Sequence, residues 1–198
     1  MHVGVLALQG DVREHEAVIE RLGGKVSRIT TPADFVGIDG LILPGGESTT
    51  MSKLLDSSGT RHLAATWVAE NRPTLGTCAG LVLLAEQLDD GRKDQVGLGG
   101  LAITVQRNGY GRQRFSFESV VIPSDGSPPF DAVFIRAPRI TAVGDEVSVL
   151  GNLMASDGEV VLVQQGSIIG CAFHPELTGD TRIHERFLAL VGETQTRG

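Results

Sequence analysis

The chain has 198 residues, a length that suits one domain, and its 24 acidic side chains outnumber 17 basic ones to give a formal net charge of −7. Such an acidic chain has no general attraction for nucleic acid or for anionic lipid, which argues against a role on either. No apolar run approaches the roughly 18 residues of a membrane span, and two cysteines are too few for a disulfide framework, so we expect a soluble, cytoplasmic protein.

In the first half of the chain, short apolar runs alternate with helical patterns. Residues 3–8 are typical of a strand buried on both faces, and Asp11 with Glu14 form the start signal of a helix that Gly23 and Gly24 end. Further strands are expected at 25–29, 39–43 and 74–77, and further helices at 49–55, 62–71 and 81–88. This alternation predicts parallel βαβ units with right-handed crossovers.

The second half of the chain has β-favouring runs in close succession. Turn residues such as Gly109, Gly111 and the pair Asp157-Gly158 separate them, which predicts antiparallel pairing. The runs are 103–106, 115–122, 132–135, 147–150, 160–164 and 168–173. An amphipathic helix at 182–191 follows, and we expect the polar tail 193–198 to fray.

No internal repeat or low-complexity linker divides the sequence. We therefore expect residues 1–198 to form a single three-layer α/β domain. Its central sheet is expected to be mostly parallel and flanked by helices, with a partly antiparallel C-terminal extension.

The sharpest local signal is Gly76-Thr77-Cys78-Ala79-Gly80, between an expected strand and an expected helix. It has the form of the G-x-S-x-G nucleophile elbow with Cys in place of Ser. The flanking glycines permit a sharp turn, and the adjacent helix N-terminus lowers a thiol pKa and offers backbone N–H groups to an anion. The alternative interpretation is a small buried cysteine that packs at a helix start.

A cysteine nucleophile needs a base that a third group orients. His174 ends the apolar run 168–173, and the following Pro175 restricts its backbone to extended conformations, while Glu176 can hold the second ring nitrogen. Strand ends gather at one rim of an open α/β sheet, so His174 and Cys78 can meet. The alternative is a turn histidine beside a solvated glutamate. We interpret the other histidines as surface or packing residues: His2, His15, His62 and His184.

A third glycine-rich turn, Pro44-Gly45-Gly46-Glu47-Ser48-Thr49, follows another expected strand. The backbone N–H groups of Gly46 and Ala79 would together form an oxyanion hole. The alternative is a simple strand-to-helix turn with Ser48 or Thr49 as N-cap. A phosphate loop is excluded because its lysine and spacing are absent, and no Cys/His cluster has zinc-ligand spacing, so we expect no metal.

Taken together, the P-G-G turn, the G-x-C-x-G elbow and the late H-P-E resemble those of the class I (triad-type) glutamine amidotransferases. Within that class the chain is similar to the glutaminase subunits of pyridoxal 5′-phosphate synthase. The segments that carry this similarity span nearly the whole chain: 8–15, 41–50, 107–113, 134–138 and 173–178.

This resemblance implies an enzyme, classed with both hydrolases and lyases, that hydrolyses L-glutamine to L-glutamate and ammonia. The ammonia would pass to a synthase subunit, a (β/α)8 barrel that builds pyridoxal 5′-phosphate, so a hetero-oligomer is expected. Because the partner makes that cofactor, we expect none to be bound here.

The resemblance also implies roles for individual residues. The catalytic triad corresponds to Cys78, His174 and Glu176, and the oxyanion donors correspond to Gly46 and Ala79. The contacts to L-glutamine correspond to Gly46, Glu47, Ser48, Arg107, Ile135 and Arg136, and the residues that face the synthase correspond to Gln9 and Gly10.

Two other functions are considered. One is the glutaminase subunit of a different synthase, such as that of histidine biosynthesis, against which the Gln9-Gly10 opening and the segment 107–113 argue. The other is a catalytically silent regulatory subunit, against which the intact set of Cys78, His174 and Glu176 argues. Cys171, in an apolar run, is expected to be inert core, and the loop 91–95 matches no motif.

Overall fold

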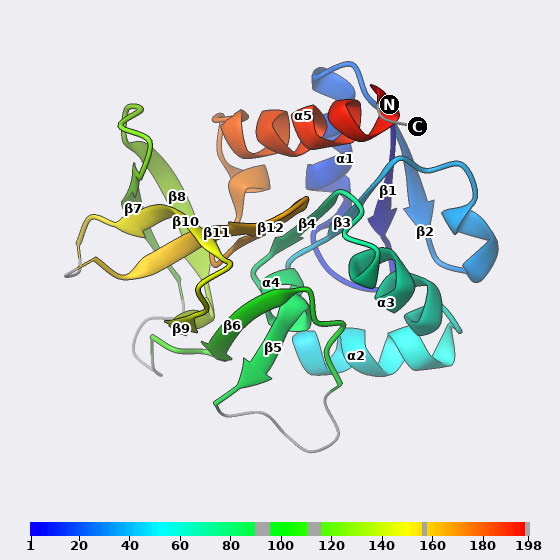
Figure 1. Ribbon diagram of the computed structural model, residues 1–198, viewed down its shortest axis with the longest axis horizontal. Coiled ribbons are helices and arrows are strands. Elements are labelled where there is room, and N and C mark those ends of the chain that lie inside the picture. Colours follow the sequence, from blue (N-terminus) through cyan, green and yellow to red (C-terminus); the bar gives the residue numbers. More distant parts are fainter. Residues whose placement is uncertain (90–95, 111–115, 156–157, 197–198) are drawn as a thin grey trace.

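A computed structural model describes residues 1–89, 96–110, 116–155 and 158–196. In these ranges the chain forms one nine-stranded sheet, in the order β2-β1-β3-β4-β12-β11-β10-β7-β8, and one three-stranded sheet, in the order β5-β6-β9 (Figure 1). The expected loop 91–95 and the end of the motif at 111–113 lie outside the described residues.

The first half of the large sheet is parallel. Its strands are β2 (Lys25–Ile29), β1 (His2–Leu6), β3 (Gly40–Leu43), β4 (Thr74–Thr77) and β12 (Ile168–Cys171). β3, β4 and β12 are buried along their whole length, as expected for short apolar runs that helices cover on both faces. The strand ends that carry the predicted site residues therefore open at the same rim of the sheet.

The second half of the large sheet is antiparallel. Its strands are β11 (Val160–Gln165), β10 (Ser148–Leu153), β7 (Ser116–Pro123) and β8 (Phe130–Ile135). β12 is the strand at which the pairing changes, because it is parallel to β4 and antiparallel to β11. This agrees with the α/β fold and the antiparallel extension that the sequence predicts.

Helices cover both faces of the large sheet (Figure 1). One face carries α1 (Val12–Arg21) and α5 (Arg182–Thr196). The other carries α2 (Ser48–Ser57), α3 (Arg61–Ala69) and α4 (Ala79–Leu84). Short 3-10 turns lie at Pro32–Phe35 and Pro175–Leu177. None of the helices in the described ranges is long and apolar enough to cross a membrane.

The small sheet differs from what the sequence predicts. It consists of β5 (Ala85–Leu88), β6 (Leu101–Gln106) and β9 (Arg139–Val143). The expected helix 81–88 is wrong in its second half: α4 ends at Leu84, and the following residues pair with β6. Leu and Ala favour a helix locally, but the backbone hydrogen bonds of the second sheet outweigh that preference here.

The C-terminal helix is longer than expected. α5 continues to Thr196, whereas the sequence predicts a frayed tail from residue 193. Phe187 and Val191 of this helix pack against Gly40 of β3, which anchors the helix on the sheet. Residues 197–198 lie outside the described residues.

Candidate active site

The turn between β4 and α4 is a sharp elbow. Cys78 at its apex has a φ of +49°, a backbone conformation that costs a non-glycine residue about 1–3 kcal/mol and is held by surrounding structure. A Cβ atom at Gly80 would overlap the carbonyl oxygen of Leu43, and one at Gly76 would come 2.8 Å from the carbonyl carbon of Gly80. Both glycines are thus required by the close approach of the backbone.

The thiol of Cys78 lies at the wall of a cavity. Cys78 is 5% exposed, and its Sγ donates a weak hydrogen bond to the carbonyl oxygen of Ile135 at 3.6 Å. Its backbone N–H donates to the carbonyl oxygen of Cys171 at 2.9 Å, which fixes the elbow to β12. The nucleophile proposed from the sequence is therefore held at a defined position beside an open space.

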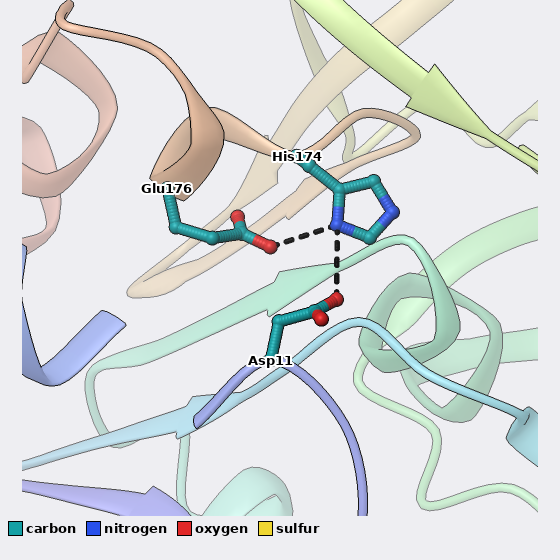
Figure 2. Close-up of side chains that lie close together, drawn as sticks. All are labelled: Asp11, His174 and Glu176. Atoms are coloured by element: carbon teal, nitrogen blue, oxygen red, sulfur yellow. Dashed lines mark hydrogen bonds and ion pairs between the residues drawn. The ribbon is translucent and has the colours of Figure 1, made fainter. Parts of the chain in front are cut away.

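His174 follows β12, the strand next to the elbow. Its backbone N–H donates to the carbonyl oxygen of Val133 at 2.8 Å, and its Nδ1 lies 2.8 Å from Oε1 of Glu176. Figure 2 shows that Asp11 approaches the same nitrogen on the side of the ring that also faces Glu176, with its Oδ2 3.3 Å away. Two carboxylates thus face one edge of the imidazole.

The charges in this cluster influence one another. Burial lowers the pKa of His174, but the interactions with Cys78 and Glu176 outweigh it and raise the pKa to about 10. Burial raises the pKa of Glu176, and His174 partly offsets that rise. Nε2 of His174 is buried, and within the described part of the chain it has no hydrogen-bond partner of ordinary geometry. This nitrogen is on the side of the ring away from Glu176 (Figure 2).

A cavity of about 540 Å³ collects most of the residues that the sequence proposes. Those that line it are Gln9, Gly46, Glu47, Ser48, Cys78, Ala79, Arg107, Ile135, Arg136 and His174. Glu176 lies behind His174, and Gly10 lines a neighbouring hollow that contains the start of α1.

The turn after β3 is held by the turn after β1. The backbone N–H of Glu47 donates to Oε1 of Gln9 at 2.8 Å, and the backbone N–H of Asp11 donates to the carbonyl oxygen of Gly45 at 3.2 Å. A Cβ atom at Gly46 would come 2.5 Å from the same Gln9 oxygen. The position proposed for an oxyanion donor is therefore set by a residue that is proposed to face the partner.

The N-cap of α2 is Glu47, so the alternative in which Ser48 or Thr49 caps this helix is wrong. The carboxylate of Glu47 accepts hydrogen bonds from the backbone N–H groups of Thr49 at 3.1 Å and Thr50 at 2.6 Å. Burial raises the pKa of Glu47, but these hydrogen bonds outweigh that effect and lower it. The Glu47 side chain thus satisfies two of the backbone N–H groups that the first turn of a helix leaves without an intrahelical partner.

Two arginines border the cavity. Nη1 of Arg107 donates to Oγ1 of Thr49 at 3.0 Å, which links the segment after β6 to the first turn of α2. Arg136 is exposed and has a φ of +45°. Both side chains can offer a charge-assisted hydrogen bond to a substrate carboxylate.

Two histidines that were interpreted as surface or packing residues are buried behind the triad residues. Nδ1 of His15 lies 3.0 Å from Nε2 of His184, and Nε2 of His15 lies 3.2 Å from Oγ1 of Thr77 and 3.4 Å from Oε2 of Glu176. The interpretation as packing residues agrees with the burial of both histidines, but it did not predict these polar contacts. A signal was present, because His15 shares an apolar helical stripe with Val18 and Ile19, and a buried imidazole needs polar partners.

Asp11, His174 and Glu176 each offer a ligand atom, and these atoms lie within 4.8 Å of one another, a spacing that a metal ion can bridge. The contacts of both carboxylates with Nδ1 of His174 account for this closeness without an ion. We therefore assign no metal site to this cluster.

Comparison with curated proteins gives a consistent group of relatives. The chain is 48% identical over 190 residues to "Pyridoxal 5'-phosphate synthase subunit PdxT" of Clavibacter sepedonicus, covering 96% of this chain and 90% of the relative. It is 45% identical over 192 residues to the protein of the same name from Thermotoga petrophila, covering 96% of this chain and all of the relative.

Comparison with solved structures agrees with this result. A structure described as "Crystal structure of glutamine amidotransferase" has a TM-score of 0.88 and 42% identity, and the match covers 96% of this chain and 98% of that one. The structure of PurLQS from Thermotoga maritima has a TM-score of 0.70 at 14% identity, which shows a shared fold alone. Residues 5–193 match the SNO glutamine amidotransferase family, and the chain belongs to that family.

Proposed function

We propose that the chain is the glutaminase subunit of a pyridoxal 5′-phosphate synthase, which hydrolyses L-glutamine and delivers the ammonia to a synthase subunit. The observation that carries this proposal is that Cys78 and His174 line one cavity while Glu176 holds His174 from behind. The relatives named above support the choice of synthase, since they share 45–48% of their residues with this chain.

The chemistry begins with Cys78. Its thiolate attacks the carboxamide carbon of glutamine, and the oxygen becomes an oxyanion that accepts hydrogen bonds from the backbone N–H groups of Gly46 and Ala79. When the tetrahedral intermediate collapses, the C–N bond breaks and Nε2 of His174 gives its proton to the departing nitrogen. Ammonia leaves, and the glutamyl group remains on Cys78 as a thioester.

The second half of the reaction hydrolyses the thioester and returns the enzyme to its starting state. Neutral His174 takes a proton from water, the hydroxide attacks the thioester carbonyl, and the same N–H groups stabilise the second oxyanion. Collapse releases glutamate and the Cys78 thiolate. The pKa of about 10 for His174 supports a protonated imidazole at neutral pH, ready to donate at the first step.

Substrate recognition is assigned to the rim of the cavity. The carboxylate of glutamine would pair with Arg107 or Arg136, and the remaining contacts would come from Glu47, Ser48 and the Ile135 backbone. A charge-assisted hydrogen bond to this carboxylate would distinguish glutamine from simple amides. No cofactor or metal is needed for these steps.

The partner is proposed to be a (β/α)8 barrel that binds near Gln9 and Gly10 in a hetero-oligomer. The contact between Gln9 and Glu47 supports this surface, because it links the turn after β1 that carries Gln9 and Gly10 (the docking turn) to the turn after β3 that carries Gly46 (the oxyanion turn). The lyase class is wrong for this chain: it belongs to an amidotransferase family, and the steps above are hydrolysis alone. The cytoplasmic location stays a prediction.

The decisive experiment measures ammonia release from glutamine by the chain with its synthase subunit. Cys78→Ala is expected to abolish release, whereas Cys171→Ala, at the other cysteine, is expected to retain it if the variant folds. Release that survives Cys78→Ala would overturn the mechanism. The wild-type chain alone is expected to be weakly active, and equal rates with and without the synthase would contradict the dependence on a partner.

A further inference from the structure

A pair of buried imidazoles extends the triad on the side away from the cavity. His15 comes from α1, His184 comes from α5, and both are completely buried. Their contacts form a continuous chain from His184 through His15 to Oε2 of Glu176. The two helices that supply them lie on the same face of the sheet (Figure 1).

The carboxylate of Glu176 has one oxygen that His174 leaves unsatisfied. Oε1 is bound by Nδ1 of His174, whereas Oε2 is buried, and the described residues give it no hydrogen bond of ordinary geometry. Nε2 of His15, at 3.4 Å, faces this oxygen. An N–H at this nitrogen is attracted to the carboxylate, whereas a lone pair would be repelled.

The same reasoning fixes the protons on both rings. With its proton on Nε2, neutral His15 must accept at Nδ1, so Nε2 of His184 is the donor across the 3.0 Å contact. This leaves Nδ1 of His184 as a bare lone pair, and that buried atom has no partner within the described ranges. A buried acceptor without a partner is tolerated more readily than a buried N–H without one.

We infer that His15 is a positioning residue for the proposed reaction: it orients the carboxylate of Glu176, and His184 fixes the tautomer that His15 needs for this. Glu176 then presents Oε1 to His174, although Asp11 stands 3.3 Å from the same nitrogen as a competitor. Oγ1 of Thr77, the neighbour of Cys78, lies 3.2 Å from Nε2 of His15 and accepts from it in this tautomer, which links His15 to the elbow.

Neutral rings suit this role. Burial and the neighbouring histidines lower the pKa of His15, and burial together with Arg21 lowers the pKa of His184 to about 4. A neutral donor orients Glu176 without adding a positive charge that would compete with protonated His174. The inference rests on the proposed function, since it assumes that Glu176 serves His174 in glutamine hydrolysis.

The kinetic test compares three variants of the full chain in complex with its synthase subunit. His15→Leu removes the donor, and we expect kcat for glutamine hydrolysis to fall about tenfold to a hundredfold, the size of a lost hydrogen bond to a buried charge, while KM stays the same. His15→Gln keeps an N–H donor of similar reach and is expected to recover most of kcat. His62→Leu, at an exposed histidine of α3, is expected to have wild-type kinetics.

A spectroscopic test is independent of activity and of the histidine variants. The nitrogen chemical shifts of the imidazoles, measured by NMR on the isolated Cys78→Ala chain, are expected to show the proton on Nε2 for both His15 and His184. This readout stands even if the chain hydrolyses no glutamine, so failure of the proposed function is distinguishable from failure of this inference. A proton on Nδ1 of His15, or wild-type kcat in a folded His15→Leu variant, would overturn it.

Discussion

Gln9 and Glu47 join two turns that are 38 residues apart in sequence, through a 2.8 Å hydrogen bond from the Glu47 backbone to the Gln9 side chain. Gln9 follows β1, the strand beside β3, and its amide lies against Gly46. The backbone that carries the proposed oxyanion donor is therefore supported by a side chain of the proposed docking turn. Binding of a partner at the turn that carries Gln9 can therefore affect the turn that carries Gly46 without any rearrangement of the sheet.

Gln9→Ala removes this support. Loss of one neutral hydrogen bond is worth about 1 kcal/mol, so we expect kcat with the synthase present to fall about fivefold. Gln9→Glu, which keeps an acceptor oxygen at the same distance from the backbone, serves as the matched control and is expected to lie closer to wild type. Steady-state ammonia release measures both, and equal kcat in wild type and Gln9→Ala would contradict this role.

The pairing of His174 with Glu176 predicts a pH-dependent stability. Cys78 and Glu176 together raise the pKa of His174 from 6.5 to about 10 in the folded chain, so folding favours its protonated form. The resulting stabilisation is fully present below pH 6.5 and is lost as the pH rises through about 10. Glu176→Gln removes the charge, and we expect it to lower the free energy of unfolding by about 1.5–3 kcal/mol at pH 7 and by less above pH 10.

Chemical denaturation of wild type and Glu176→Gln across this pH range checks the prediction. The difference between the two proteins is the informative quantity, because other groups that titrate at alkaline pH affect both alike. A difference that stays constant from pH 7 to pH 11 would show that His174 does not carry the charge.

The lowered pKa of His184 predicts that the stability of the fold decreases as the pH becomes acidic. Burial and Arg21 lower its pKa from 6.5 to about 4, so the folded chain favours its neutral form. This contribution is fully present above pH 6.5 and is lost as the pH falls through about 4. A shift of this size corresponds to about 3 kcal/mol. His184→Leu should therefore show a smaller loss of stability between pH 6.5 and pH 4 than wild type does, as measured by urea unfolding. Equal slopes would contradict the assignment.

Arg107 predicts a specific effect on substrate binding. If its guanidinium pairs with the glutamine carboxylate, Arg107→Gln should raise KM about tenfold to a hundredfold, because a charge-assisted hydrogen bond is lost. The change in kcat should be smaller, since the carboxylate is remote from the reacting carbon. Arg186→Gln, which removes a charge from α5 on the other face, is the control and should leave KM unaltered. An unchanged KM in Arg107→Gln would direct attention to Arg136.

The two cysteines are predicted to differ in reactivity. Cys78 borders the cavity, whereas Cys171 is completely buried in β12, where burial raises the pKa of its thiol. Iodoacetamide is expected to modify Cys78 in the native chain and to leave Cys171 intact until denaturant is added. Peptide mapping by mass spectrometry reads both sites, with Cys78→Ser as the control. Rapid modification of Cys171 in the native protein would contradict its role as inert core.

Local sequence patterns predict the parts of the site that depend on strand ends. Cys78 and His174 each follow a short apolar strand, and β4 and β12 prove to be neighbours in register, with Thr77 opposite Cys171. The rim rule for open sheets requires only that such strands lie side by side. It therefore places both residues without any knowledge of their side-chain contacts.

The contacts behind the triad depend on helix packing, which no local pattern contains. His15 and His184 are 169 residues apart and meet only because α1 and α5 share one face of the sheet. Asp11 was predicted as a helix start signal, and its approach to His174 follows from the turn after β1. β5 was missed for a related reason, because its pairing with β6 overrides a local helix preference.

The glycines of the catalytic turns have a consequence for how this site can change over generations. A Cβ atom at Gly45 would overlap the His174 ring, and one at Gly10 would overlap the Gly45 carbonyl, just as one at Gly80 would overlap Leu43. Any side chain larger than glycine at these positions therefore requires the surrounding atoms to shift. At the exposed mouth, replacement of Asn108 or Arg136 creates no overlap of this kind, although their positive φ values restrict the choice of residue. Divergence in substrate range should therefore accumulate at the mouth while the wall remains fixed.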